Sequence, residues 1–214
     1  MYDESDALNE HREDSERLRV AMVLSGAFAI LLWLVKIAES MTGVALPEYG
    51  IHPGTASGLL GILTAPLIHS SPEHLLANTL PIVILGTALL YGYPKAARVV
   101  LPVLFLGTGL GVWLIGRPSY HVGASGIIFG LMFFVFVSGV LRWDRRAIGL
   151  ASAAFFLYGG MVWEVLPVRP QISYEAHLSG AILGIVLAFL LRTLDPPRAP
   201  KRYSWEIEPR TPIE

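Results

Sequence analysis

Residues 123–130 read Gly-Ala-Ser-Gly-Ile-Ile-Phe-Gly and place Ser125 at the start of a long apolar stretch. Residues 175–184 read Glu-Ala-His-Leu-Ser-Gly-Ala-Ile-Leu-Gly and place His177 at the start of another. Polar and ionisable side chains inside a membrane are costly, and they usually mark a functional site. We therefore expect the hydroxyl and the imidazole to act together, and the chain to perform chemistry inside a bilayer.

The composition indicates a lipid environment. Of the 214 residues, 53% are hydrophobic and 15% are charged, whereas a soluble domain carries about 25% charged residues. The formal net charge of −1 gives no electrostatic basis for binding nucleic acid. Because the chain contains no cysteine, disulfides, thiolate catalysis and cysteine metal sites are excluded.

A helix needs about 20 mostly apolar residues to cross a bilayer, and six stretches of the sequence meet this requirement. Their approximate ranges are 18–38, 73–92, 96–115, 123–141, 146–165 and 174–192. We predict an all-α membrane protein in which residues 18–193 form a six-helix bundle. Residues 1–17 are predicted to be a charged, solvated and partly disordered tail, and residues 194–214 a second tail.

Lysine and arginine give the orientation, because these residues concentrate on the cytoplasmic side of a membrane protein. With the N-terminus inside, 13 of the 16 Lys and Arg residues lie on the inner side, and Lys36, Arg117 and Arg169 lie outside. We therefore predict that both tails are cytoplasmic. The second, fourth and sixth spans then begin on the outer side, and their first turns bring four polar residues to one depth, namely His74, Asn78, Ser125 and His177.

A serine hydroxyl is a weak nucleophile until a base accepts its proton, and His177 is the candidate base for Ser125. Proton transfer between two helices requires their backbones to approach closely. Beside the two residues lie two glycine pairs at a spacing of four, Gly126 with Gly130 and Gly180 with Gly184. Such pairs allow close helix packing in membranes. We therefore predict a hydrogen bond between Ser125 and His177.

A third, carboxylate member is not expected beside the imidazole. All five aspartates are cytoplasmic in the predicted topology, and Glu175 points to a different helix face from His177. Glu164 lies near the outer end of the fifth span, but no feature of the sequence places it on the ring. The sequence therefore favours a Ser–His dyad over a triad.

Acyl transfer also needs hydrogen-bond donors for the oxygen that becomes negatively charged. His74 and Asn78 are four residues apart and share one helix face, and both side chains can donate. The backbone N–H of Ser125, at the start of its helix, is a third candidate donor. His69 is a candidate to hydrogen-bond the adjoining loop or to help admit water.

Each of these residues also has a structural interpretation. Serine in a glycine-rich membrane helix usually serves packing, and Asn78 alone more often links helices than stabilises an oxyanion. Structural or interfacial roles are favoured for His69 and His121. Packing is the expected role of Gly107, Gly109 and Gly111.

The combination of motifs resembles the rhomboid family of intramembrane serine proteases. The resemblance covers about residues 50–192 and rests on three motifs in order on alternate spans, His74-x-x-x-Asn78, Gly123-Ala124-Ser125-Gly126 and Ala176-His177-x-x-Gly180-x-x-x-Gly184. It implies a six-helix fold with Ser125 as nucleophile and His177 as general base. The oxyanion site that it implies consists of His74, Asn78 and the Ser125 amide.

The chain departs from the usual family pattern at three places. Many members carry a tyrosine four residues after the nucleophile, where this chain has Phe129, which keeps the ring face and loses the hydroxyl. The family often has a Trp-Arg pair in the loop after the first span, where residues 58–62 read Gly-Leu-Leu-Gly-Ile, and a glutamate that is missing around residues 88–91. None of these changes removes a proton-transfer group, so we expect an active enzyme.

The resemblance implies an endopeptidase that cleaves transmembrane segments of single-pass membrane proteins near the outer face of the cell membrane. No cofactor or metal ion is expected for this chemistry. Two alternatives stay open. One is a metal or solute transporter that uses the outer histidines, since imidazole suits zinc or copper. The other is a rhomboid-like protein that binds membrane helices without catalysis.

Overall fold

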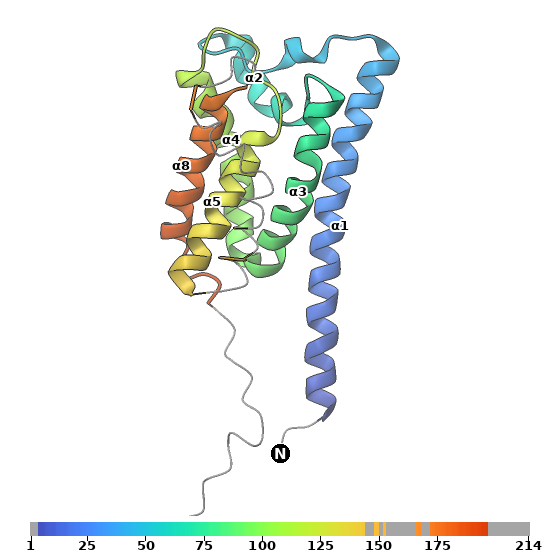
Figure 1. Ribbon diagram of the computed structural model, residues 1–214, viewed down its shortest axis with the longest axis vertical. Coiled ribbons are helices and arrows are strands. Elements are labelled where there is room, and N and C mark those ends of the chain that lie inside the picture. Colours follow the sequence, from blue (N-terminus) through green and yellow to red (C-terminus); the bar gives the residue numbers. More distant parts are fainter. Residues whose placement is uncertain (1–3, 144–147, 150–151, 153–165, 168–171, 197–214) are drawn as a thin grey trace, which may run out of the picture.

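The computed structural model describes residues 4–143, 148–149, 152, 166–167 and 172–196 (Figure 1). Helices dominate this part of the chain, and within it the two β-type residues form one isolated bridge between Ile51 and His121. The elements in order are α1 (Glu4–Thr42), η1 (Leu46–Tyr49), α2 (Ala56–Thr64), η2 (Ala65–Leu67), α3 (Pro72–Gly92), α4 (Pro94–Ile115), α5 (Ser125–Arg142) and α8 (Tyr174–Leu190).

Four of the described helices are long and apolar enough to cross a membrane, namely α1, α3, α4 and α5. Helix α8 is equally apolar but shorter, with 17 residues. These five helices coincide with five of the six predicted spans. The remaining prediction, a span at 146–165, lies almost entirely outside the described residues.

Helix α1 is longer than predicted. Its 39 residues correspond to about 58 Å, whereas the hydrocarbon core of a bilayer is about 30 Å thick. The helix begins at Glu4, so residues 4–17 of the predicted tail continue α1, and residues 11–20 are mostly exposed. The hydroxyl of Tyr91 donates a hydrogen bond of 2.8 Å to Asp14, which ties this extension to the end of α3.

The start of α1 and the end of α8 lie at the same end of the bundle, and α2 lies at the opposite end (Figure 1). The sequence predicts this arrangement for a chain whose two tails share one side. The first residues of α3, α5 and α8 lie at the α2 end (Figure 1). Consequently the predicted site residues on these three helices are at one level of the bundle.

Local sequence explains where the helices begin. Thr55, Ser71 and Ser173 cap α2, α3 and α8, because each hydroxyl accepts a hydrogen bond from a backbone N–H of the first turn. Pro72 and Pro94 lie at the first positions of α3 and α4, where a missing N–H costs nothing.

Helix α5 is the most buried of the membrane-length helices, and it packs against α3, α4 and α8. The contact with α8 is made backbone to backbone. A Cβ added at Gly180 would overlap the carbonyl oxygen of Gly126, and one added at Gly184 would overlap that of Gly130. The predicted close approach is therefore confirmed, and its geometry suits Cα–H···O contacts between the two helices.

The three glycines of α4 serve packing, as the sequence predicts. A Cβ at Gly107 or Gly111 would meet Leu183 or Ser179 of α8, and one at Gly109 would lie 2.8 Å from Ile62 of α2. These positions let α4 lie close to both neighbours.

The elements between α1 and α3 were not predicted. Helix α2 forms where the sequence lacks the family's usual Trp-Arg pair. It is fastened to α4, because the Trp113 indole donates to the carbonyl of Thr55 over 2.8 Å and Gly54 donates to the carbonyl of Trp113 over 3.1 Å. The threonine cap followed by apolar residues was the available signal for this helix.

The glycine contact between α5 and α8 gives a testable stability difference. We expect Gly180→Ala to destabilise the fold by about 1–3 kcal/mol, because the methyl group must displace the backbone of α5. Gly26→Ala in α1 is the matched control, since a Cβ there meets nothing within 4 Å. The measurement is thermal unfolding in detergent. Equal melting temperatures for the two variants would contradict the backbone contact.

Candidate active site

Ser125 and His177 are hydrogen-bonded, with 2.8 Å between the serine Oγ and the imidazole Nε2. Ser125 is the first residue of α5, and His177 is the fourth of α8. Both side chains are buried, with exposed fractions of 9% and 2%. This geometry has the distance that proton transfer from a hydroxyl to an imidazole requires.

The ring of Phe129 stacks on the ring of His177, with 4.1 Å between the centroids and 7° between the planes. Phe129 lies one turn after Ser125 on α5 and is completely buried. The expectation that the phenylalanine presents its ring face to the imidazole is confirmed. One helix therefore supplies both the hydroxyl and a flat surface that holds the imidazole plane.

A glycine with a left-handed backbone leads into Ser125. Gly123 has a φ of +115°, and its N–H donates a 2.8 Å hydrogen bond to the carbonyl of Ala65. The turn ends at Ala124, and α5 begins with Ser125. The first N–H groups of a helix have no acceptor within it, and the helix dipole makes this end positive. The serine amide is thus available to an oxyanion.

His74 lies against this turn. A Cβ at Gly123 would be 2.7 Å from Cε1 of His74, and the Nδ1 of His74 is 3.2 Å from the hydroxyl of Ser70. Asn78 is buried one turn later on α3, and its amide nitrogen donates to the carbonyl of His74 over 3.1 Å. An amide nitrogen has two N–H groups, so one remains for a further acceptor.

A family model for the rhomboid domain matches residues 56–194. The chain belongs to the rhomboid family. An uncharacterized protein of Mycobacterium tuberculosis (strain ATCC 25618 / H37Rv) is 39% identical over 174 residues, which cover 77% of this chain and 72% of the relative. An uncharacterized protein of Mycobacterium leprae is 36% identical over a region that covers 84% of this chain and 75% of the relative.

Rhomboid-like proteins of Arabidopsis thaliana are also similar. Rhomboid-like protein 11, chloroplastic, is 32% identical over 151 residues, which cover 60% of this chain and 51% of the relative. RHOMBOID-like protein 2 is 28% identical over a region that covers 68% of this chain and 44% of the relative. The matched region contains every residue of the site described above.

His69 supports the serine turn of this rhomboid. Its Nε2 accepts a long hydrogen bond of 3.5 Å from the N–H of Ala124, and its ring meets that of His74 edge to face. Burial, followed by the proximity of His74, lowers the pKa of His69 to about 4. The imidazole is therefore neutral at pH 7, as an acceptor at Nε2 must be. The hydrogen bond goes to the turn before α5 and not to the adjoining loop that the sequence suggested, and a role in admitting water stays a prediction.

Lys36 of α1 holds the same loop, a role that the sequence did not indicate. Its ammonium donates to the carbonyl of His69 over 2.9 Å and to that of Ser70 over 3.5 Å. Glu39 pairs with it at 2.8 Å, and the two side chains are only 12% and 13% exposed. A nearly buried ion pair thus fixes the backbone between η2 and α3, the segment that carries His69 and leads to His74.

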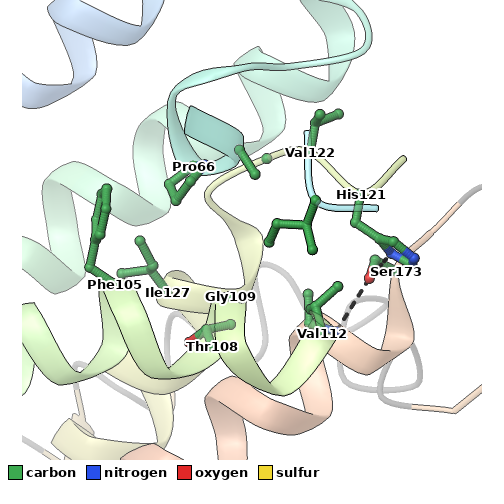
Figure 2. A pocket seen from close by; sticks show the side chains of 14 residues that line it. Pro66, Phe105, Thr108, Gly109, Val112, His121, Val122, Ile127 and Ser173 are labelled. Atoms are coloured by element: carbon green, nitrogen blue, oxygen red, sulfur yellow. Dashed lines mark hydrogen bonds between the residues drawn. The ribbon is translucent and has the colours of Figure 1, made fainter. Parts of the chain in front are cut away.

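A small cavity of about 30 Å³ lies between α4 and the entrances of α5 and α8. Figure 2 shows His121 and Ser173 on one side of it, and Phe105 and Ile127 on the other. The Nδ1 of His121 is 2.7 Å from the hydroxyl of Ser173. His121 therefore has the structural role that the sequence favours.

The positive φ of Gly123 and its contact with His74 can be separated by mutation. Gly123→Ala adds strain of about 1–2 kcal/mol and pushes against the His74 ring, so we expect loss of both stability and serine reactivity. Gly54→Ala is the matched control, since its φ is +71° and a Cβ there meets nothing within 4 Å. Thermal unfolding and the rate of fluorophosphonate labelling measure the two effects. If both variants label at the same rate, the contact with His74 does not matter.

Proposed function

We propose that this rhomboid is an intramembrane serine endopeptidase with a Ser125–His177 dyad. The observation that carries the proposal is the 2.8 Å hydrogen bond between the two side chains, buried at the entrances of two apolar helices. The stacked ring of Phe129 supports it. In a hydrogen bond of this kind the imidazole can accept the serine proton while the oxygen attacks a carbonyl carbon.

The reaction proceeds through two tetrahedral states. Oγ of Ser125 bonds to the carbonyl carbon, and Nε2 of His177 accepts the proton and then gives it to the leaving amine. The acyl-enzyme is hydrolysed when a water molecule attacks and His177 again accepts and returns a proton. The Ser125 amide, His74 and Asn78 are the proposed donors to the oxyanion.

The proposed substrates are single-pass membrane proteins, cleaved in or near the outer part of their transmembrane helix. A peptide bond in a helix is shielded by its own backbone hydrogen bonds, so residues that weaken the helix should favour cleavage. The excess of Lys and Arg on one side supports cytoplasmic tails and an active site toward the extracytoplasmic side of the cell membrane.

The transporter alternative has little support. No group of three or more His, Cys, Asp or Glu side chains within the described ranges could hold a metal ion. His121 is engaged by Ser173, and His177 by Ser125. The second alternative, a membrane-helix binder without catalysis, is an outcome of the labelling experiment that follows.

We expect Ser125→Ala and His177→Ala each to lower cleavage by about 10⁴-fold or more, with the double variant no worse, because groups that act as a unit are non-additive. The assay is co-expression with single-span substrates, together with fluorophosphonate labelling of the purified protein. Ser138→Ala is the matched control, since Ser138 is a fully buried serine on the same helix. Wild-type cleavage by Ser125→Ala would refute the proposal, and an unlabelled wild type would favour the non-catalytic binder.

Asn78→Ala should be less damaging than either change in the dyad. Loss of one oxyanion donor lowers the rate by about 10²–10³-fold where it contributes strongly, and two other candidate donors remain here. Thr79→Ala is the control, because Thr79 accepts a hydrogen bond from Trp33 and should affect stability without the same loss of rate. A folded Asn78→Ala protein as inactive as Ser125→Ala would show that Asn78 is the principal donor.

A further inference from the structure

A charged pair joins the end of α4 to the start of α8. The guanidinium Nε and the backbone N–H of Arg117 both donate to Oε1 of Glu175, over 2.8 and 3.1 Å. A second guanidinium nitrogen donates to the carbonyl of Ile172 over 2.6 Å. The Glu175 side chain is 1% exposed and that of Arg117 is 36% exposed, so the carboxylate is buried while its partner remains partly exposed.

A second link runs beside the first. Ser173, the cap of α8, has its hydroxyl 2.7 Å from Nδ1 of His121 and 3.3 Å from the carboxylate of Glu175. The Nε2 of His121 is in turn 3.0 Å from the carbonyl of Arg117. Arg117, His121, Ser173 and Glu175 therefore form one connected group, which we name the entry clamp.

The entry clamp lies directly before both members of the dyad. Arg117 and His121 belong to the segment that leads to Ser125. Ser173 caps α8, and Glu175 lies in its first turn, which contains His177. The first turn of a helix has unpaired N–H groups and is the part that frays. A first turn that carries the base of a dyad therefore needs fixing from outside the helix.

We propose that Arg117 and Glu175 are positioning residues, which hold the first turn of α8 so that His177 stays in hydrogen-bonding register with Ser125. The proposal rests on the proposed function, because its readout is the reactivity of Ser125. The glycine contact of α5 with α8 brings the helices together further inside the bundle, whereas the entry clamp fixes the two segments at the level of the dyad. A misplacement of about 1 Å at a reacting group can cost about 100-fold in rate.

The opposite end of α8 offers a matched control. The carboxylate of Asp195 accepts hydrogen bonds from the N–H groups of Lys95 and Ala96 over 3.1 and 2.8 Å, and so caps α4. The carbonyl of the same residue accepts from Arg142. Asp195 is 8% exposed. A buried carboxylate thus lies at each end of the contact between α4 and α8. Asp195→Asn removes the negative charge at one end, and Glu175→Gln removes it at the other.

The experiment measures fluorophosphonate labelling of Ser125 per folded molecule, with thermal unfolding giving the folded fraction. We expect Glu175→Gln to label about 10–100-fold more slowly than the wild type, and Asp195→Asn to label at the wild-type rate despite a lower melting temperature. With a single-span substrate, Glu175→Gln should lower kcat per folded molecule and leave KM unchanged. A general loss of stability would lower the total rate and leave kcat per folded molecule at the wild-type value.

Three results would overturn the entry-clamp proposal. Wild-type labelling by folded Glu175→Gln would do so, and so would equal slowing by Asp195→Asn. If Glu175→Gln does not fold, Arg117→Lys is the deciding variant. Lysine keeps the positive charge but cannot donate from two fixed nitrogens to Glu175 and Ile172 at once. Labelling of Arg117→Lys at the wild-type rate then overturns the proposal. An unlabelled wild type would instead overturn the proposed function itself, and the clamp proposal with it.

Discussion

The contact between the backbones of α5 and α8 is the constraint on which the rest of the site depends. At Gly180 and Gly184 there is no room for a side chain, because the carbonyl oxygens of Gly126 and Gly130 lie where a Cβ would be. Lipid gives apolar surfaces no reason to associate, so helices in a membrane are held by close packing and polar links. This contact sets the separation of the two helices, and with it the separation of Ser125 and His177.

Polar links then fix the helix ends that lie on the α2 side of the bundle against one another. Lys36 holds the backbone before α3, His69 and Ala65 hold the turn before α5, and the entry clamp holds the start of α8. In each case, one partner of the hydrogen bond is a backbone group in a segment without regular secondary structure. Unpaired backbone N–H and C=O groups cost several kcal/mol in hydrocarbon. These links therefore give the loop backbone its hydrogen-bond partners, and they also position the residues that follow each loop.

The hydrogen-bonded pair of the candidate site could be predicted from sequence because its signals are local. Ser125 and His177 each lie beside a glycine pair, and Phe129 follows the serine by one helical turn. The supports could not be predicted in this way, since Arg117 and Glu175 are 58 residues apart and Lys36 and His69 are 33 apart. The short helices between α1 and α3 also escaped prediction. They are too short to cross a bilayer, and their pattern alone does not distinguish them from a loop.

The acid closest to His177 in the sequence is engaged by other groups. Glu175 is two residues from His177, but its carboxylate is occupied by Arg117 and by the hydroxyl of Ser173. Glu175 therefore contributes to the site through the backbone of α8, and the face of Phe129 defines the plane of the imidazole. A ring face fixes the plane of the imidazole, whereas the charged pair lies at the helix entrance and fixes the position of the first turn of α8. Plane and position are therefore set by different contacts, one from α5 and one from the segment that follows α4.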